Sequence, residues 1–189
     1  MSATWINRQP ENRNYLSGVN FKLQLMKCPS VEFFCQAANV PGISLLTAEQ
    51  PTRFNSIPIP GDEVQYEDLT VRFLVDEDLK NYAEIHSWIR ELGHPYDLKE
   101  LYDAQTEAEK SILYYGGYAS EGSVYSQAIL HILNSNFKPK YKVVFRDVFP
   151  ISLGSLNFDS SLTDPGYFPV EASFKYTIYD ILSTNDEPI

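Results

Sequence analysis

The clearest pattern of hydrophobic and polar positions lies between residues 69 and 92, where a period of two gives way to a helical period. The segment 69–75 alternates, and this period places Leu69, Val71, Phe73 and Val75 on one face of a strand. The next apolar positions recur at three- and four-residue steps, which is typical of a helix face. They are Leu79, Tyr82, Ile85, Trp88, Ile89 and Leu92. The pattern predicts a helix-sheet core of Phe73, Val75, Tyr82, Ile85, Trp88 and Ile89.

Local signals bound this helix. Asp76 or Asp78 can accept the free amide hydrogens of the first helical turn. Gly93 follows the last apolar position and indicates a left-handed cap, and Pro95 cannot continue a helix. We therefore expect the helix to end at Gly93.

Alternation also predicts strands on both sides of this unit. Residues 19–27 and 31–38 flank Pro29-Ser30, which predicts a hairpin. Residues 124–133 also fit a helix, but the turn signal at 134–136 and the alternating segment 141–145 favour a second hairpin. A short strand is expected at 156–158 and a closing strand at 170–181. The fold class expected is mainly β (α+β), a small antiparallel β-barrel or split sandwich with one packed α-helix.

The other segments have no clear period. Residues 1–18 read as an arm that can grip a neighbour, and residues 183–189 as a loose tail. Residues 41–61 read as an extended loop, because Pro51, Pro58 and Pro60 confine such a segment to edges and loops. This loop either docks on another subunit or meanders over its own. Residues 93–123 read as an insertion with a short surface helix, all within a single domain of residues 1–189.

Composition narrows the function. A chain of 189 residues with 43% hydrophobic residues can bury one good core. The net charge of -10 argues against binding nucleic acid by phosphate neutralisation. No apolar run approaches the roughly 20 residues that span a bilayer, and the N-terminus lacks a signal-peptide pattern. We expect a soluble chain that is not exported and has no stable membrane binding.

Charge is uneven along the chain. Acidic residues crowd the middle of the sequence, whereas Lys138, Lys140 and Lys142 lie together on the late hairpin. An acidic edge and a basic edge on one chain can join copies head to tail, and such contacts form rings when the rotation closes. The alternative is a solvated surface.

Few residues suggest chemistry. His86, His94 and His131 are scattered without metal-ligand spacing. Asp76-Glu77-Asp78 lacks the rest of a calcium loop, and neither a phosphate loop nor a nucleophile elbow occurs. Cys28 and Cys35 are expected to stay reduced. We expect no enzyme and no cofactor.

The order of these signals resembles the tail tube proteins of contractile-tailed bacteriophages. The resemblance rests on residues 33–41 before an extended segment, Pro60-Gly61-Asp62, the strand 66–75 with its acidic stop, and the helix with Trp88. Residues 144–159 and a final alternating strand look like the closing pattern of that family. The segment 93–123 is longer than a minimal tube subunit needs. It leaves open a specialised junction or initiator ring at the baseplate end.

The resemblance implies a virion protein assembled in the host cytoplasm, repeated as six copies in a ring, with rings stacked into a conduit for DNA. Expected partners are sister copies and neighbouring tube, baseplate, hub and sheath proteins. The candidate ring contacts are Pro41, Gly42, Arg53, Phe54, Ile57, Ile59, Lys138, Lys140 and Lys142. A different class of function is also open: a monomeric ligand-binding β-barrel with a tyrosine-rich interior.

Overall fold

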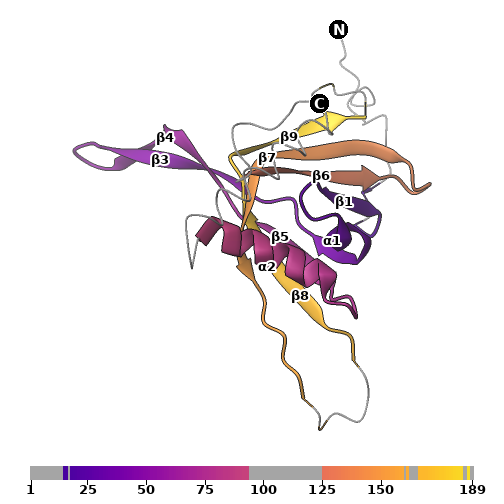
Figure 1. Cartoon of the computed structure of the whole chain (residues 1–189). Coiled ribbons are helices and arrows are strands. Elements are labelled where there is room, and N and C mark those ends of the chain that lie inside the picture. The colour runs from indigo at the N-terminus through magenta and orange to yellow at the C-terminus, as the bar shows by residue number, and fades with distance from the viewer. Residues whose placement is uncertain are drawn as a thin grey trace.

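The computed structural model describes residues 15–16, 18–93, 125–159, 161, 166–184 and 187. Most of the predicted arm and the predicted insertion with its short helix lie outside these residues. The elements are β1 (Phe21–Leu25), α1 (Pro29–Phe33), β2 (Cys35–Ala38), β3 (Ile43–Pro51), β4 (Ser56–Tyr66), β5 (Leu69–Leu74), α2 (Lys80–Gly93), β6 (Ser126–Leu133), β7 (Pro139–Leu153), β8 (Pro169–Lys175) and β9 (Ile178–Ser183). Figure 1 shows a body of strands with α2 lying across it and the β3–β4 hairpin projecting away.

The body is one antiparallel sheet folded into two halves. Its strand order is β1-β6-β7-β8-β5-β2, and β9 also pairs with β7. The long strand β7 belongs to both halves: residues 141–146 pair with β9, and residues 149–153 pair with β8. Between them Asp147 has a φ of 55°. A left-handed residue redirects the chain, so β7 bends from one half-sheet into the other.

The fold class predicted from the sequence is confirmed in its sandwich form. Among the described residues, β1 and β2 stand at the two ends of the strand order, without a ladder joining them. The sheet is therefore split and open, and it is not a closed barrel. The predicted hairpin of 124–133 and 141–145 is confirmed as β6 and β7, which pair antiparallel.

The core lies between the half-sheets and α2. Leu69, Val71 and Phe73 of β5 and Ile85 of α2 are 0% exposed, and Trp88 is 1% exposed. Trp88 packs near Phe174 of β8, with ring centroids 6.2 Å apart. Val75, Tyr82 and Ile89 are partly buried against this cluster. The predicted unit of a strand followed by an amphipathic helix is thus present, and all six residues assigned to its core lie there.

The start of α2 differs from the prediction. The buried Asn81, rather than Asp76 or Asp78, organises the turn: its Oδ1 accepts the Asp76 amide at 3.2 Å, and its Nδ2 donates to the Leu74 carbonyl at 2.7 Å. Asp78 instead pairs with Lys80. Leu79 has a φ of 58° and precedes the helix, so it does not belong to the apolar stripe.

The last described residue of α2 is Gly93, as predicted, but the predicted cap is wrong. Gly93 is still helical and has no left-handed φ, so it is not the predicted cap.

The predicted N-terminal hairpin is wrong. Pro29 occupies the first turn of the short helix α1, a position for which its fixed φ is suited. This helix separates the two strands, so β1 pairs with β6 and β2 pairs with β5. Both cysteines that flank α1 are free, as predicted, and Cys28 is buried.

Two predictions for the C-terminal part are also corrected. Residues 156–158 form no strand. The closing strand is broken at Tyr176 and Thr177 into β8 and β9. The break follows from the bend of β7, because β8 and β9 pair with parts of β7 that lie in different halves of the sheet. β8 pairs with β5 and the end of β7, and β9 pairs with the first part of β7.

Candidate assembly surfaces

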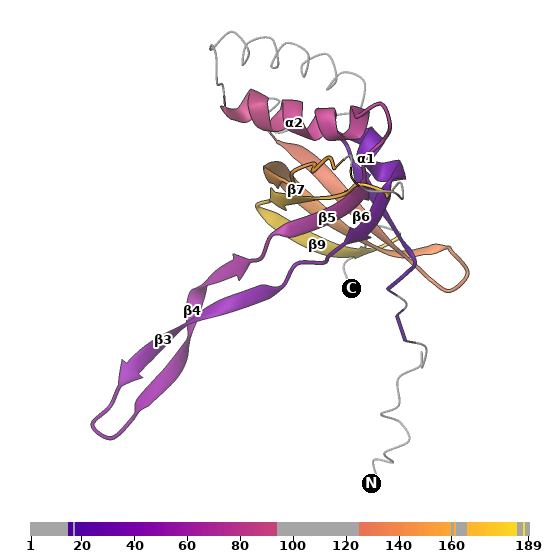
Figure 2. The ribbon, with the colours of Figure 1, turned by 90° about the horizontal axis from the view of Figure 1, so that it is seen from below.

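The β3–β4 hairpin is the most exposed part of the described chain. Every residue of β3 is exposed, as are most of β4. Figures 1 and 2 both show this two-stranded ribbon leaving the body. The segment 41–61, predicted as an extended loop, is therefore a paired hairpin that continues to Tyr66. Its prolines fit because each strand of a two-stranded ribbon keeps one free edge.

The hairpin changes register near its middle. Leu45 pairs with Val64 and Thr47 pairs with Pro60, so residues 61–63 of β4 lie opposite Leu46 alone. Along β3 the period of two then places Leu45 on one face of the ribbon and Leu46 on the other. Apolar side chains occupy one face near the body and the opposite face toward the tip.

The apolar side chains of the hairpin have large exposed areas. The set near the body is Ile43, Leu45 and Val64, and the set toward the tip is Leu46, Ile57 and Ile59. At the tip, Phe54 is 94% exposed and the Arg53 guanidinium lies 5.8 Å from its ring centroid. Exposed apolar side chains gathered on one element are typical of an interaction surface. The predicted contact residues Arg53, Phe54, Ile57 and Ile59 are thus brought together on one projecting element.

The base of the hairpin is fixed to the body. Pro41 is buried, and its carbonyl accepts the Tyr179 hydroxyl at 3.2 Å. The Gly42 amide donates to the Glu67 carboxylate at 3.3 Å, and the Glu67 amide donates to the Gly42 carbonyl at 3.1 Å. Pro41 therefore attaches the hairpin to its own body, and its expected role as a subunit contact stays a prediction. Gly42 remains exposed.

The predicted basic contacts lie elsewhere. Lys138 and Lys140 are exposed at the β6–β7 turn, which Asn134 closes by accepting the Lys138 amide at 3.0 Å. The Lys140 ammonium lies 5.1 Å from the Tyr141 ring centroid, and Lys142 is half-buried. In both Figure 1 and Figure 2 this turn and the β3–β4 hairpin extend from opposite sides of the body. The predicted contact residues thus form two separate surfaces.

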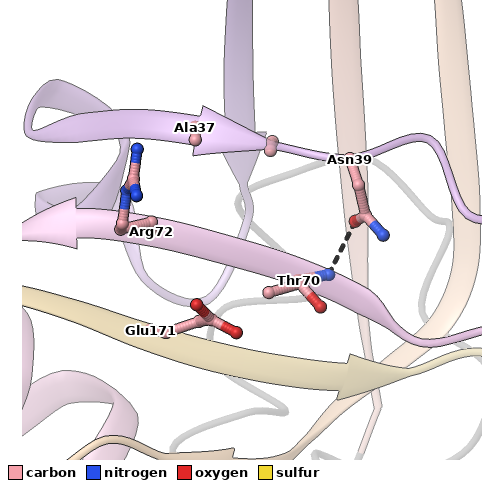
Figure 3. Close-up of a pocket in the computed structure, with 6 residues that line it drawn as sticks. Ala37, Asn39, Thr70, Arg72 and Glu171 are labelled. Atoms are coloured by element: carbon pink, nitrogen blue, oxygen red, sulfur yellow. Dashed lines mark hydrogen bonds between the residues drawn. The ribbon is translucent and has the colours of Figure 1, made fainter.

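Two hollows in the described surface are open. One lies beside Phe33, and another of about 260 Å³ lies over β2, β5 and β8. Figure 3 shows the second, where the Asn39 Oδ1 accepts the Thr70 amide at 2.7 Å and Arg72 and Glu171 lie nearby. Neither hollow is the enclosed interior that the ligand-binding alternative requires.

The histidines considered as catalytic or metal-binding candidates lie apart from one another in the described chain. His86 is exposed on α2, and burial lowers the pKa of His131, with Lys142 adding to the effect. No group of three histidine, cysteine or acidic residues within the described ranges could hold a metal ion. In the same part of the chain, none of the helices has the length and apolar character to cross a membrane.

Sequence reasoning missed several exposed or bridging aromatic residues. Phe158 and Phe168 lie in the connection between β7 and β8, with ring centroids 5.1 Å apart. Tyr66, Tyr176 and Tyr179 join the hairpin to the body. The only available signal was the high tyrosine content, because these residues are far apart in sequence and belong to different strands.

The fold of this chain is an open antiparallel sandwich with one packed helix. It is similar to the fold of chains from contractile injection systems. It is similar to a chain of an extracellular contractile injection system sheath–tube complex in the extended state, with a TM-score of 0.53 and 15% identity over 97% of this chain and 99% of that one. It is also similar to a chain of the tube-terminating cap of an anti-feeding prophage, with a TM-score of 0.54 and 14% identity over 97% and 100% of the two chains. At these identities the likeness establishes the fold.

The family follows from the sequence itself. Residues 8–182 match the phage tail tube protein family, and the chain belongs to that family. A chain of the anti-feeding prophage baseplate is similar as well, with a TM-score of 0.50 and 10% identity over 86% of this chain and 91% of that one. No curated protein matches the sequence. The protein is thus a structural component of a tail, as its resemblance to tail tube proteins predicted.

Proposed function

We propose that this chain is a ring-forming subunit of the inner tube of a contractile tail, or of the junction ring at the baseplate end, with six copies around a hollow axis. The observation that supports the proposal is the β3–β4 hairpin, whose apolar side chains the described part of the chain leaves exposed. A sister copy in the same or the adjacent ring would cover them. The subunit acts by assembly, without catalysis or a cofactor.

The placement of charge supports head-to-tail contacts. The hairpin carries exposed Glu49, Asp62 and Glu63, whereas the opposite side of the body carries Lys138 and Lys140. Surfaces of opposite charge on opposite sides of one subunit suit a heterologous contact, which closes into a ring when the rotation is right. In this arrangement the hairpin of one copy reaches the lysine-bearing side of the next.

The free edges of the sheet support the same arrangement. β1 and β2 end the strand order in the described chain, and an exposed strand edge invites pairing with another chain. Sister copies would complete these edges around the ring. DNA would then pass through the central channel of the ring. The channel wall would bind DNA weakly, because the chain has a net charge of -10. The assembled virion tail would add sheath, baseplate and hub proteins, with assembly in the host cytoplasm.

A charged substitution at the outer half of the hairpin tests the proposal. Ile57→Asp with Ile59→Asp adds two charges to exposed side chains of a hairpin that projects from the body (Figure 1), so the melting temperature should stay close to that of the parent. Rings and tubes should be lost in negative-stain images and in sedimentation velocity. The matched control is Ala83→Asp with Ser87→Asp, which adds the same charge to the exposed side of α2 and should assemble like the parent.

Two results would overturn the proposal. One is a parent chain that stays monomeric at every concentration, alone and with its tail partners. The other is a folded hairpin variant that forms rings as readily as the parent.

A further inference from the structure

We propose that a tyrosine cluster, formed by Tyr66, Tyr176 and Tyr179, fixes the direction of the β3–β4 hairpin in the free subunit and so positions it for assembly. This inference rests on the proposed function, because it assumes that the hairpin is the contact between copies. It assigns a positioning role to three residues at the junction of the hairpin and the body.

Ring contacts connect the hairpin to the core. Tyr66 ends β4, and its ring centroid lies 5.9 Å from that of Tyr176 and 5.6 Å from that of Tyr179. Both of these rings in turn contact Phe145 of β7, at 5.1 Å and 5.7 Å. Phe145 is fully buried. Three of these contacts are edge-to-face and the Phe145–Tyr179 contact is tilted. Such contacts favour particular ring orientations, so the last residue of the hairpin is packed on the core in a defined way.

Hydrogen bonds hold both chain segments that enter and leave the hairpin. The Tyr179 hydroxyl donates to the Pro41 carbonyl just before β3, at 3.2 Å. The Tyr176 hydroxyl donates to the Glu67 carbonyl just after β4, at 2.9 Å. Burial, with Tyr179 and Tyr66 adding to it, raises the pKa of Tyr176, so its hydroxyl keeps the proton that it donates. An ion pair of Lys175 with Asp68, at 2.6 Å, lies beside this second attachment.

The length of the hairpin makes the position of its tip sensitive to small rotations at its base. Nine residues of β3 extend about 30 Å from the base, so a rotation of about 10° there displaces the tip by about 5 Å. A displacement of that size would take Phe54 and Ile57 away from a partner surface. Fixing the base beforehand lowers the ordering cost of association, which is the usual benefit of preorganisation.

Tyrosine-to-phenylalanine variants test whether the hydroxyl hydrogen bonds position the hairpin, because they keep the packing of the rings. Tyr176→Phe with Tyr179→Phe removes both hydroxyls and keeps the rings. The matched control is Tyr82→Phe, which removes a hydroxyl that donates to the Gly154 carbonyl at 3.3 Å on a different part of the body. Nitroxide labels at Phe54→Cys and His86→Cys, in a background with Cys28→Ala and Cys35→Ala, report the distance between the hairpin tip and α2 in the monomer. A thermal melt of each labelled protein establishes that it is folded.

The double variant should broaden the distance distribution of the monomer and raise the critical concentration for assembly about tenfold, because two hydrogen bonds at the base are lost. Tyr82→Phe should change neither quantity. A distribution as narrow as that of the parent in the folded double variant would overturn the positioning role. The two proposals can also fail separately. If the parent distribution is narrow and broadens in the double variant, but the parent chain never assembles, the positioning role of the tyrosine cluster stands and the proposed function is overturned.

Discussion

Gly61 of β4 lies directly against the carbonyl oxygen of Leu46 in β3. A Cβ at this position would come within 3.0 Å of that oxygen, closer than real Cβ atoms approach. The contact lies where the hairpin changes register, between the Leu45–Val64 and Thr47–Pro60 pairs. Glycine is therefore required there by the close approach of two backbones.

Gly61→Ala should disrupt the hairpin and leave the body folded. The added methyl group must push β3 and β4 apart at the register shift, while the core of the body lies elsewhere. We expect the melting temperature to remain near that of the parent and the assembly of rings to fail, as judged by a circular dichroism melt and negative-stain images. Gly18→Ala is the control, since a Cβ there meets nothing within 4 Å. Normal assembly of Gly61→Ala would show that the outer hairpin is dispensable.

Trp88→Ala should destabilise the body strongly. The indole is 1% exposed and packs against Phe174, and the Lys27 ammonium lies 5.1 Å from its ring centroid. Removing a buried Trp side chain costs about 3–5 kcal/mol in free energy of unfolding. Urea denaturation measures the change, and His86→Ala, at an exposed position of the same helix, should alter it by less than about 0.5 kcal/mol. A loss below about 1 kcal/mol for Trp88→Ala would mean that the helix is not held by this side chain.

The sequence predicted the central unit well because its two periods are long and uninterrupted. Strand β5 and helix α2 follow the alternation and the helical stripe almost to the residue. The pairing of strands was harder to predict. Pro29 can start a helix as readily as a turn, and only the path of α1 shows that β1 and β2 belong to different halves of the sheet. The bend of β7 at Asp147 likewise has no signature in hydrophobicity.

The candidate surface was predicted in part. Prolines and apolar residues marked residues 41–61 as an extended segment that could dock, and this segment is the exposed hairpin. Its pairing was missed because Pro51, Pro58 and Pro60 argue against a central strand, whereas a two-stranded ribbon has only edges. The attachment of the hairpin by Tyr176 and Tyr179 joins residues more than a hundred positions apart, which no local pattern can reveal.

Asn39→Ala should weaken the end of the β2–β5 ladder. The Asn39 side chain continues the ladder beyond β2. Its Oδ1 accepts the Thr70 amide at 2.7 Å (Figure 3), and its Nδ2 donates to the Asp68 carbonyl at 3.1 Å. Losing these partly solvated bonds should cost about 1 kcal/mol in free energy of unfolding, measured by urea denaturation. Asn157→Ala, at an exposed position outside any strand, is the control and should cost less than about 0.5 kcal/mol. Equal losses for the two variants would remove the special role of Asn39.

Cys28 should make the stability of the body fall at high pH. Burial, with Glu84 adding to it, raises the pKa of this thiol from 9.0 to about 12. The unfolded chain releases the proton near pH 9 while the folded chain keeps it, so the folded state binds more protons above pH 9 and stability decreases as pH rises. Between pH about 8 and about 10 the parent should lose about 1.4 kcal/mol through this group.

Lysines and tyrosines also titrate in this range, so the test compares the parent with Cys28→Ala. Urea denaturation at both pH values gives the free energy of unfolding of each protein. The advantage of the parent over the variant should shrink by about 1.4 kcal/mol between pH about 8 and about 10, because the variant lacks the thiol that titrates in the unfolded state. A constant difference would mean that the folded thiol ionises as easily as the unfolded one, which would contradict its burial at the start of α1.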